Sequence, residues 1–290
     1  MACKWSDTCF ESCSRLVPKF VFKQTGVNPL EDQLFNVTGT VVLVSGGSRG
    51  IGEALAKGFA ERKAAVIISG REKKSLQAVA SKLSEYSKDI EPIVCDVSNE
   101  EQVIDLVQNV VKKYGKIDTL LNVAGVSKRK KIENFTSEEY NFIFDINLRG
   151  AFLLSQAVGK QMIKAKRGSI INIDSLNTYA PLRGVGVYAM SKAGVLMMTK
   201  AQALEWGRHK IRVNSIAPGF FPTKMTSETW KKNHMIEWAK TNTPLGKLGD
   251  VEELIGTAIF LASPASKFIT GQTIRVDGGI TAGFNWPLEI

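Results

Sequence analysis

Tyr188 and Lys192 are the pair of residues in this chain whose types and spacing most clearly suggest chemistry. They lie four residues apart, about one helical turn, so on a helix the phenol and the ammonium share one face. A lysine held beside a tyrosine stabilises the phenolate, and we expect it to lower the tyrosine pKa from about 10 toward neutrality. Such a group is suited to general acid or base catalysis. The spacing alone arises by chance in many helices, so the rest of the sequence must decide.

A glycine-rich loop lies upstream, between an apolar run and a helical pattern. Its glycines have a G-x-x-x-G-x-G spacing within the segment SGGSRGIG at 45–52. Glycines at such a place allow a tight turn and let the backbone approach a pyrophosphate at a helix N-terminus. The loop therefore predicts a dinucleotide site. The residues expected to contact the cofactor here are Gly46, Ser48, Arg49, Gly50, Ile51 and Gly52.

The end of the second predicted strand bears on which dinucleotide binds. Gly70 and Arg71 stand where NAD-selective sites usually place an acidic residue for the ribose hydroxyls. With Arg49 in the preceding loop, Arg71 supplies a second guanidinium group suited to a 2′-phosphate. We therefore predict NADP(H) in preference to NAD(H); two ordinary surface arginines are the alternative reading.

The elements that position these residues alternate along the chain. Residues 40–44 form a continuous apolar run typical of a strand buried on both faces, and residues 51–59 follow with the helical period. Strands alternating with helices imply right-handed crossovers and a parallel sheet. We predict an α/β fold: a single Rossmann-type doubly wound domain with a seven-stranded parallel sheet and helices on both faces. Further strands are expected at 65–69, 91–95, 119–123, 169–174, 211–217 and 273–276, and further helices at 73–86, 103–114, 138–165, 187–206 and 251–262.

Two segments depart from this alternation. Residues 1–36 hold three of the four cysteines and have no clear period, so we interpret them as an N-terminal extension. The catalytic domain would then occupy residues 37–290. Residues 220–243 follow the carboxyl end of a strand, which predicts a lid or substrate-binding insertion. A surface helix with an apolar stripe is the alternative for that segment.

Composition narrows the class of protein. The 290 residues are 44% hydrophobic and 23% charged, as is usual for a soluble globular chain. No apolar run reaches about 18 residues, so we expect no membrane-spanning helix, and we expect no signal peptide. The cysteines include no Cys-x-x-Cys pair, which predicts no metal site, free thiols and a cytoplasmic location. The net charge of +10 fits either a solvated basic surface or attraction of anionic ligands; no nucleic-acid-binding motif accompanies it.

With these residues in place, the chain resembles the short-chain dehydrogenase/reductase family over residues 38–280. The resemblance rests on several motifs that occur in the family's order after the glycine loop. These are Cys95-Asp96-Val97, Asn122-Val123-Ala124-Gly125, Asn147 in the segment INLRG, Ser175 thirteen residues before Tyr188, and Pro218-Gly219 followed by Thr223. Val123 departs from the family's Asn-Asn-Ala-Gly at its second position.

The resemblance implies a role for each residue. Tyr188 would donate a proton to the substrate's carbonyl oxygen in reduction, or accept one in oxidation, and Ser175 would hydrogen-bond the same oxygen. Lys192 would bind the nicotinamide ribose and lower the pKa of Tyr188, while Asn147 would hold a water in a proton relay. These roles agree with elementary chemistry, because hydride arrival at carbon builds negative charge on oxygen. The implied cofactor contacts beyond the glycine loop and Arg71 are Asp96, Val97, Asn122, Ala124, Gly125, Tyr188, Lys192, Pro218, Gly219 and Thr223.

Asp174 and the basic residues near the site have competing readings. Asp174 is less usual beside the serine, and strand alternation predicts that it points away from Ser175 as a structural hydrogen-bonding partner. The basic run at 128–131 and Arg183 would steer an acidic substrate, or would form an ordinary solvated surface.

The substrate and the assembly are predicted from similarity. The segments at 203–206 and 243–250 look most like the gluconate 5-dehydrogenase branch, so we predict a small polar substrate, with keto-sugar acids as candidates. A 3-oxoacyl-[acyl-carrier-protein] reductase is the alternative. A non-catalytic NADP-binding sensor is an alternative of another class, although it would need neither Tyr188 nor Lys192. The resemblance also implies a homo-oligomer, a tetramer or a dimer, paired through the helices at 138–165 and 187–206 and through the last strand region.

Overall fold

A computed structural model of the chain describes residues 33–283; the predicted N-terminal extension up to residue 32 and residues 284–290 lie outside the described part. Within it, seven parallel strands form one sheet in the order β3-β2-β1-β4-β5-β6-β7. The predicted α/β class and seven-stranded parallel sheet are therefore confirmed. The strands are β1 (Val41–Ser45), β2 (Ala65–Gly70), β3 (Ile90–Val94), β4 (Thr119–Asn122), β5 (Gly168–Ile173), β6 (Ile211–Pro218) and β7 (Thr273–Val276).

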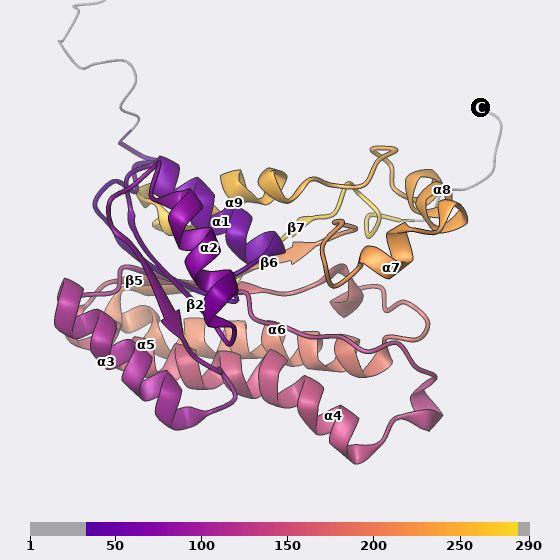
Figure 1. Cartoon of the computed structure of the whole chain (residues 1–290), viewed down its shortest axis with the longest axis horizontal. Coiled ribbons are helices and arrows are strands. Elements are labelled where there is room, and N and C mark those ends of the chain that lie inside the picture. The colour runs from indigo at the N-terminus through magenta and orange to yellow at the C-terminus, as the bar shows by residue number, and fades with distance from the viewer. Residues whose placement is uncertain (1–32, 284–290) are drawn as a thin grey trace, which may run out of the picture. The chain divides into compact units, whose positions relative to one another are not determined.

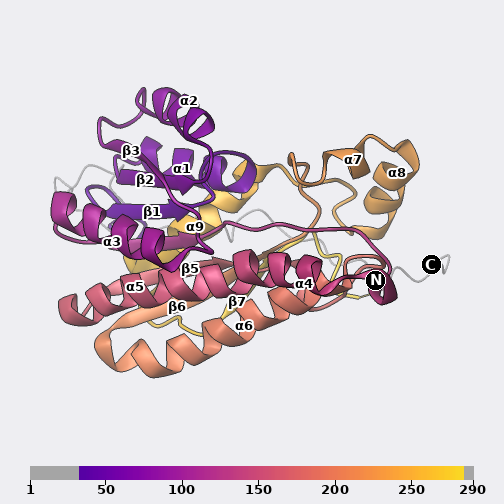
Figure 2. The same ribbon diagram turned by 60° about the horizontal axis from the view of Figure 1, so that its bottom comes forward.

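Helices cover both faces of the sheet (Figure 1, Figure 2). Apolar side chains of α1, α2 and α9 pack on one face, and those of α3, α5 and α6 pack on the other. The doubly wound arrangement predicted from the alternating pattern is thus the one observed. The helices are α1 (Gly50–Glu61), α2 (Lys73–Leu83), α3 (Glu100–Tyr114), α4 (Ser137–Phe144), α5 (Gly150–Ala165), α6 (Gly186–Trp206), α7 (Ser227–Trp230), α8 (Asn233–Asn242) and α9 (Ile255–Ala262).

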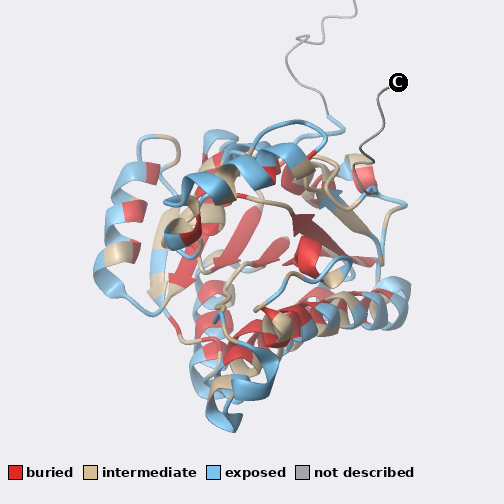
Figure 3. Cartoon of the chain, turned by 90° about the vertical axis from the view of Figure 1, so that its right-hand side faces the viewer, coloured by how far each residue is buried: buried red, intermediate tan, exposed pale blue. Residues whose placement is uncertain are grey.

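The central strand β1 shows why its sequence is apolar without alternation. Val42 and Val44 are buried against α1 and α2, whereas Leu43 is buried against the helices of the opposite face. Successive side chains of a strand point to opposite faces, so a strand covered on both sides needs apolar residues at every position. Figure 3 shows the buried strands inside helices whose outer faces are exposed.

The long helix predicted over 138–165 is interrupted by a π-helical turn. A capping box at Thr136 and Glu139 starts α4, and the π-helical segment Asp145–Arg149 separates α4 from α5. Such wide turns occur frequently at functional sites, because the extra residue in the turn re-aims the neighbouring side chains. This one contains Asn147, so a local departure from the regular helix sets the direction of a predicted site residue.

The insertion predicted at 220–243 consists of a loop and the short helices α7 and α8, which lie beyond the end of β6 (Figure 1). An aromatic cluster fastens these helices: the ring of Phe220 packs edge-on against Trp230 at 5.5 Å and against Trp238 at 5.9 Å between centroids. The tryptophans that suggested a surface stripe therefore hold the insertion to the end of a strand. Its role as a lid stays a prediction.

Candidate active site

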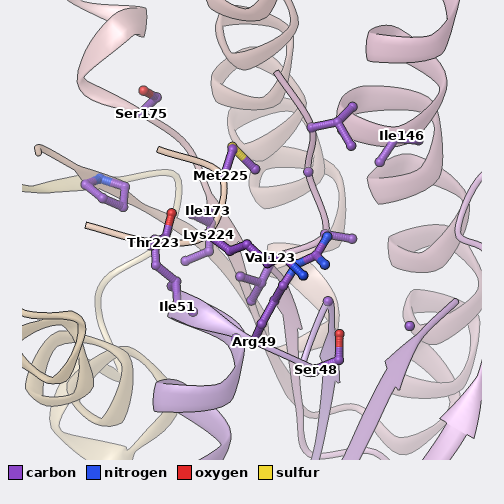
Figure 4. A pocket seen from close by; sticks show the side chains of 18 of the residues that line it. Ser48, Arg49, Ile51, Val123, Ile146, Ile173, Ser175, Thr223, Lys224 and Met225 are labelled. Atoms are coloured by element: carbon purple, nitrogen blue, oxygen red, sulfur yellow. The ribbon is translucent and has the colours of Figure 1, made fainter. Parts of the chain in front are cut away.

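A cavity opens at the carboxyl ends of the strands, where the loops after β1 to β6 converge with the start of α6. In open parallel sheets, ligands bind at this edge where the chain switches sides, here between β1 and β4. Figure 4 shows Ser48 and Arg49 at one end of the cavity and Ser175 at the other. The predicted site residues that line it are Gly46, Ser48, Arg49, Gly50, Ile51, Gly52, Arg71, Asp96, Val97, Ala124, Gly125, Ser175, Tyr188, Lys192, Pro218, Gly219 and Thr223.

The glycine loop forms one wall by close backbone contact. Gly46 has a φ of +71°, and a Cβ there would lie 2.8 Å from the backbone of Ala124. A Cβ on Gly52 would lie 2.2 Å from the carbonyl oxygen of Gly46, so only glycine fits either position. Helix α1 begins at Gly50, and the side chain of Arg49 does not cap it. The uncapped N–H groups of its first turn fit a pyrophosphate, which this N-terminus would bind.

The far end of the cavity holds the two arginines predicted to select the cofactor. Arg49 and Arg71 are exposed cavity-lining residues from the loops after β1 and β2. Asp96 lies on the adjacent wall, where its Oδ1 accepts hydrogen bonds from the N–H and Oγ of Ser98, at 3.0 and 2.7 Å. These two bonds shape the turn after β3.

Asn122 departs from its predicted role as a cavity residue. Its Nδ2 donates to Ser155 Oγ and to Asn172 Oδ1, both at 2.8 Å, and it is not among the residues that line the cavity. The side chain therefore ties β4 to α5 and β5 from within. The motif identifies the position but not the direction in which the side chain points, because that direction is set by the helix packed behind the strand.

Asn147 fastens the loop after β4 to helix α6. Its Oδ1 accepts from the N–H of Val126 at 2.8 Å, and its Nδ2 donates to the Val126 carbonyl at 2.9 Å and to Ser191 Oγ at 3.0 Å. The side chain is buried behind the cavity wall, close to Gly125. Its predicted part in a proton relay is not tested by this geometry, but the residue does connect the two walls of the site.

Ser175, Tyr188 and Lys192 come together at the inner end of the cavity. Ser175 caps a short 3₁₀ turn at Leu176–Thr178 and hydrogen-bonds the Tyr188 side chain. Lys192 is buried; its Nζ donates to the carbonyl oxygen of Ile173 at 2.6 Å and lies 5.8 Å from the centroid of the Tyr188 ring. Helix α6 therefore places the phenol and the ammonium on one face, as the four-residue spacing predicts.

The ionisation of this pair differs from the sequence prediction. Burial raises the pKa of Tyr188 to about 12, although the Ser175 hydrogen bond lowers it, and Asp174 raises it further. Burial also lowers the pKa of Lys192 to about 8, against an opposing effect of Asp174. The expected lowering of the Tyr188 pKa by Lys192 is therefore wrong for the protein chain on its own. The ammonium donates to the backbone carbonyl of Ile173, and its nitrogen lies 5.8 Å from the centroid of the Tyr188 ring.

Several cavity residues were missed by sequence reasoning. Lys224, Met225 and Thr226 continue the loop that carries Thr223, so their neighbourhood in the sequence was an available signal. Ile146 and Phe221 are apolar residues whose patterns equally fit the core. Asp174 lines the cavity although it was expected only as a structural partner; it does make such a bond, from Thr178 Oγ1 to its Oδ1 at 2.5 Å.

The basic run at 128–131 is partly neutralised. Lys128 and Lys130 both pair with Glu139, at 3.5 and 2.8 Å. The Lys130 hydrogen bond is the largest of the effects that lower the pKa of Glu139 to about 2. These contacts link the loop to the start of α4 and reduce the charge available for steering a substrate.

Residues 33–283 include neither a membrane-spanning helix nor a cluster of metal-binding side chains. No helix there is both long and apolar enough to span a membrane. Over the same residues, no group of three or more His, Cys, Asp or Glu side chains is arranged to hold a metal ion.

Comparisons with known proteins agree with this geometry. A family profile described as "Enoyl-(Acyl carrier protein) reductase" matches residues 46–281. The chain is 39% identical to gluconate 5-dehydrogenase of Gluconobacter oxydans, over 86% of this chain and 97% of that protein. It is 38% identical to a 3-oxoacyl-[acyl-carrier-protein] reductase of Thermotoga maritima, over 83% and 98%. A crystal structure of gluconate 5-dehydrogenase from Burkholderia cenocepacia in complex with NADP and tartrate has a TM-score of 0.83 and 35% identity, covering 87% and 98%.

The buried ammonium predicts a pH-dependent stability. The pKa of Lys192 falls from 10.5 to about 8 on folding, so between those values the unfolded chain binds a proton that the folded chain has lost. Stability due to this group then rises with pH across that interval, by about 3 kcal/mol in order of magnitude. In urea unfolding, the stability of Lys192→Met relative to the native chain should decline as pH rises from 8 to 10.5, because only the native chain gains stability from this lysine over that interval. Lys200→Met, at an exposed lysine on the same helix, is the control; a stability difference that does not vary with pH would contradict the prediction.

Proposed function

This chain belongs to the short-chain dehydrogenase/reductase family of oxidoreductases, and from that premise we propose the specific reaction that its site carries out. The protein transfers hydride, with NADP(H), between nicotinamide and the carbonyl or secondary alcohol of a small polar substrate, and keto-sugar acids are the class that we favour. The observation that carries the proposal is the convergence of Ser175, Tyr188 and Lys192 in a cavity whose other end is the glycine loop.

The chain's own residues supply the proton and the charge stabilisation. The glycine loop, Pro218 and Gly219 would hold the cofactor, and its nicotinamide would supply the hydride in reduction and accept it in oxidation. Negative charge then develops on the substrate oxygen, and Tyr188 donates its phenolic proton there while Ser175 donates a hydrogen bond. Burial raises the pKa of Tyr188 to about 12, so the phenol keeps its proton at neutral pH and can donate it in reduction. Lys192 provides a positive charge next to Tyr188, and its hydrogen bond to the Ile173 carbonyl holds the ammonium in place.

The substrate class is supported by the relatives and by the loop after β6. Gluconate 5-dehydrogenase is among the relatives, and the Burkholderia cenocepacia structure holds tartrate, a small hydroxy acid. Lys224 adds a cationic side chain to the cavity, suited to a carboxylate. A 3-oxoacyl-thioester reductase is the second candidate, favoured by the 38% identity to the Thermotoga maritima enzyme.

We propose NADP(H) rather than NAD(H) on the charge at the adenosine end. Arg49 and Arg71 both line the cavity there, and a guanidinium group can bind two phosphate oxygens at once.

Cys95, a free buried thiol, fits a reducing compartment, so the proposed location is the cytoplasm.

We also propose that the protein is a homo-oligomer paired through α5 and α6. These helices leave apolar side chains outside: Leu204 is 86% and Met197 is 62% exposed, beside the half-exposed Phe152. Met197 and Phe152 line an apolar groove that includes Met198 and Trp206. A second copy presenting the same faces would cover these exposed apolar side chains.

The reaction is tested by following NADPH oxidation with 5-keto-D-gluconate, acetoacetyl thioesters and diketones. We expect the keto-sugar acid to give the highest kcat/KM. Tyr188→Phe should lower kcat by about a thousandfold, because the proton donor is lost, while NADPH binding stays within a few fold. Tyr179→Phe, a tyrosine outside the cavity lining, serves as the control. Normal turnover by Tyr188→Phe would refute the mechanism, and NADPH binding without turnover of any carbonyl would favour the sensor.

Cofactor selection is tested by Arg71→Asp. Losing a guanidinium and gaining a like charge beside the 2′-phosphate should weaken NADPH binding by about ten- to a hundredfold, with little change for NADH. Isothermal titration with both cofactors measures this directly. Lys74→Asp makes the same charge change on exposed α2, outside the cavity lining, and should leave both affinities close to native. Equal losses for both cofactors, or none, would contradict the assignment.

The assembly is tested by placing charge in the exposed apolar face. Leu204→Glu and Met197→Glu should each lower the oligomeric state in sedimentation velocity, because an interface would have to bury an unpaired carboxylate. Ile104→Glu makes a similar change at an exposed residue of α3 and should leave the assembly intact. A native protein that sediments as a monomer would remove the proposal.

A further inference from the structure

Asp174 is a buried carboxyl group on the cavity wall to which the mechanism above gives no role. It lies directly after β5, is 1% exposed, and lines the cavity. Thr178 Oγ1 donates to its Oδ1, but its Oδ2 is buried without a hydrogen-bond partner. A carboxylate buried in this way is costly unless a nearby positive charge compensates it.

The geometry of β5 directs this side chain toward helix α6. Asn172, two residues earlier on the same face of the strand, donates from Nδ2 to Thr199 Oγ1 of α6 at 2.8 Å. Thr199 lies about two helical turns after Lys192, so the continuing strand meets the earlier turns of α6. Lys192 Nζ is in fact bonded to the carbonyl of Ile173, the residue before Asp174. The side chain of Asp174 therefore lies on the face of the strand that packs against α6, away from Ser175 as alternation predicts.

Few charged groups surround this carboxyl. From α6, Lys192 and Tyr188 interact electrostatically with it, and from the turn after β5 the hydroxyl of Thr178 donates to it. The other charged side chains of the cavity belong to the loops after β1, β2, β3 and β6, and none of them shifts the pKa of Asp174. These residues are Arg49, Arg71, Asp96 and Lys224.

We propose that Asp174 is a positioning residue of this active site, whose negative charge keeps the ammonium of Lys192 protonated and the phenolic proton on Tyr188. It touches neither substrate nor cofactor in this role and acts through the two α6 side chains. The proposal rests on the proposed reductase function in one respect: protons retained on this pair are the protons that carbonyl reduction consumes.

The ionisation of the cluster is consistent with this arrangement. Asp174 raises the pKa of both Tyr188 and Lys192, opposing the burial that lowers the latter to about 8. Burial raises the pKa of Asp174 itself to about 6, against lowering effects of Thr178 and Lys192. Asp174 is thus mostly ionised at neutral pH, where it acts. Removing its charge lets both α6 groups lose their protons at lower pH, so the two effects add.

The first test needs no substrate. Lysine labelled at its ε-carbon reports the titration of Lys192 by NMR, with Lys192→Met identifying the signal. In Asp174→Asn, which keeps the shape and removes the charge, the Lys192 midpoint should fall by about one pH unit. Asp174→Glu, which keeps the charge, should retain the native midpoint. Should Asp174→Asn fail to fold, Asp174→Ser removes the same charge in a smaller side chain.

The second test uses the pH profile of kcat/KM for 5-keto-D-gluconate reduction by NADPH. Its alkaline limb should move down by about one pH unit in Asp174→Asn and stay in place in Asp174→Glu. A lower kcat with unmoved limb and unmoved Lys192 midpoint would mean that Asp174 only packs, and would overturn the proposal. If the native protein reduces no carbonyl, the proposed function fails, whereas the NMR titration still decides the role of Asp174.

Discussion

The buried ammonium of Lys192 is the contact on which the site depends. A cation without water is unfavourable, and here the Ile173 carbonyl and the charge of Asp174 replace the lost solvation. Both come from the end of β5, so satisfying the lysine fixes the register of α6 against the sheet. Tyr188, one turn earlier, is thereby placed beside Ser175, which follows the same strand. The contacts that stabilise the buried lysine therefore also set the position of Tyr188, the proposed proton donor.

Buried amides hold the rest of this frame. The Asn122, Asn172 and Thr199 side chains form a hydrogen-bonded chain from β4 through β5 to α6, and Asn147 binds both backbone groups of Val126. Leaving such groups unpaired in the interior costs about 1–3 kcal/mol each, so this network favours one arrangement of strands and helices. The π-helical turn is part of the same solution, because it carries Asn147. Tyr188 and Lys192, two of the residues proposed to be catalytic, therefore lie on a long helix, while most of the remaining cavity wall is built from loops.

Much of this arrangement was predictable from the residues. The apolar runs, the helical periods and the glycine loop at 45–52 each follow from local rules, so the sheet, its order of elements and the cofactor wall could be inferred. The ordered motifs around Asn147, Ser175 and Tyr188 located the cavity. Asn122 shows where this reasoning stops: the motif finds the position, but the helix behind the strand decides that its amide points inward.

The sequence by itself determined which groups meet, because spacing of four on a helix and alternation on a strand are local geometry. It specified the Tyr188 and Lys192 pair, the glycine cradle and the basic residues at the adenosine end. Only the tertiary structure decided their ionisation. Burial raises the pKa of Tyr188, although its spacing from Lys192 predicts a lower value, and burial lowers the pKa of Lys192. The charge of Asp174 also acts on this pair. Solvation and long-range charge depend on what surrounds a group in space and not on its neighbours along the chain.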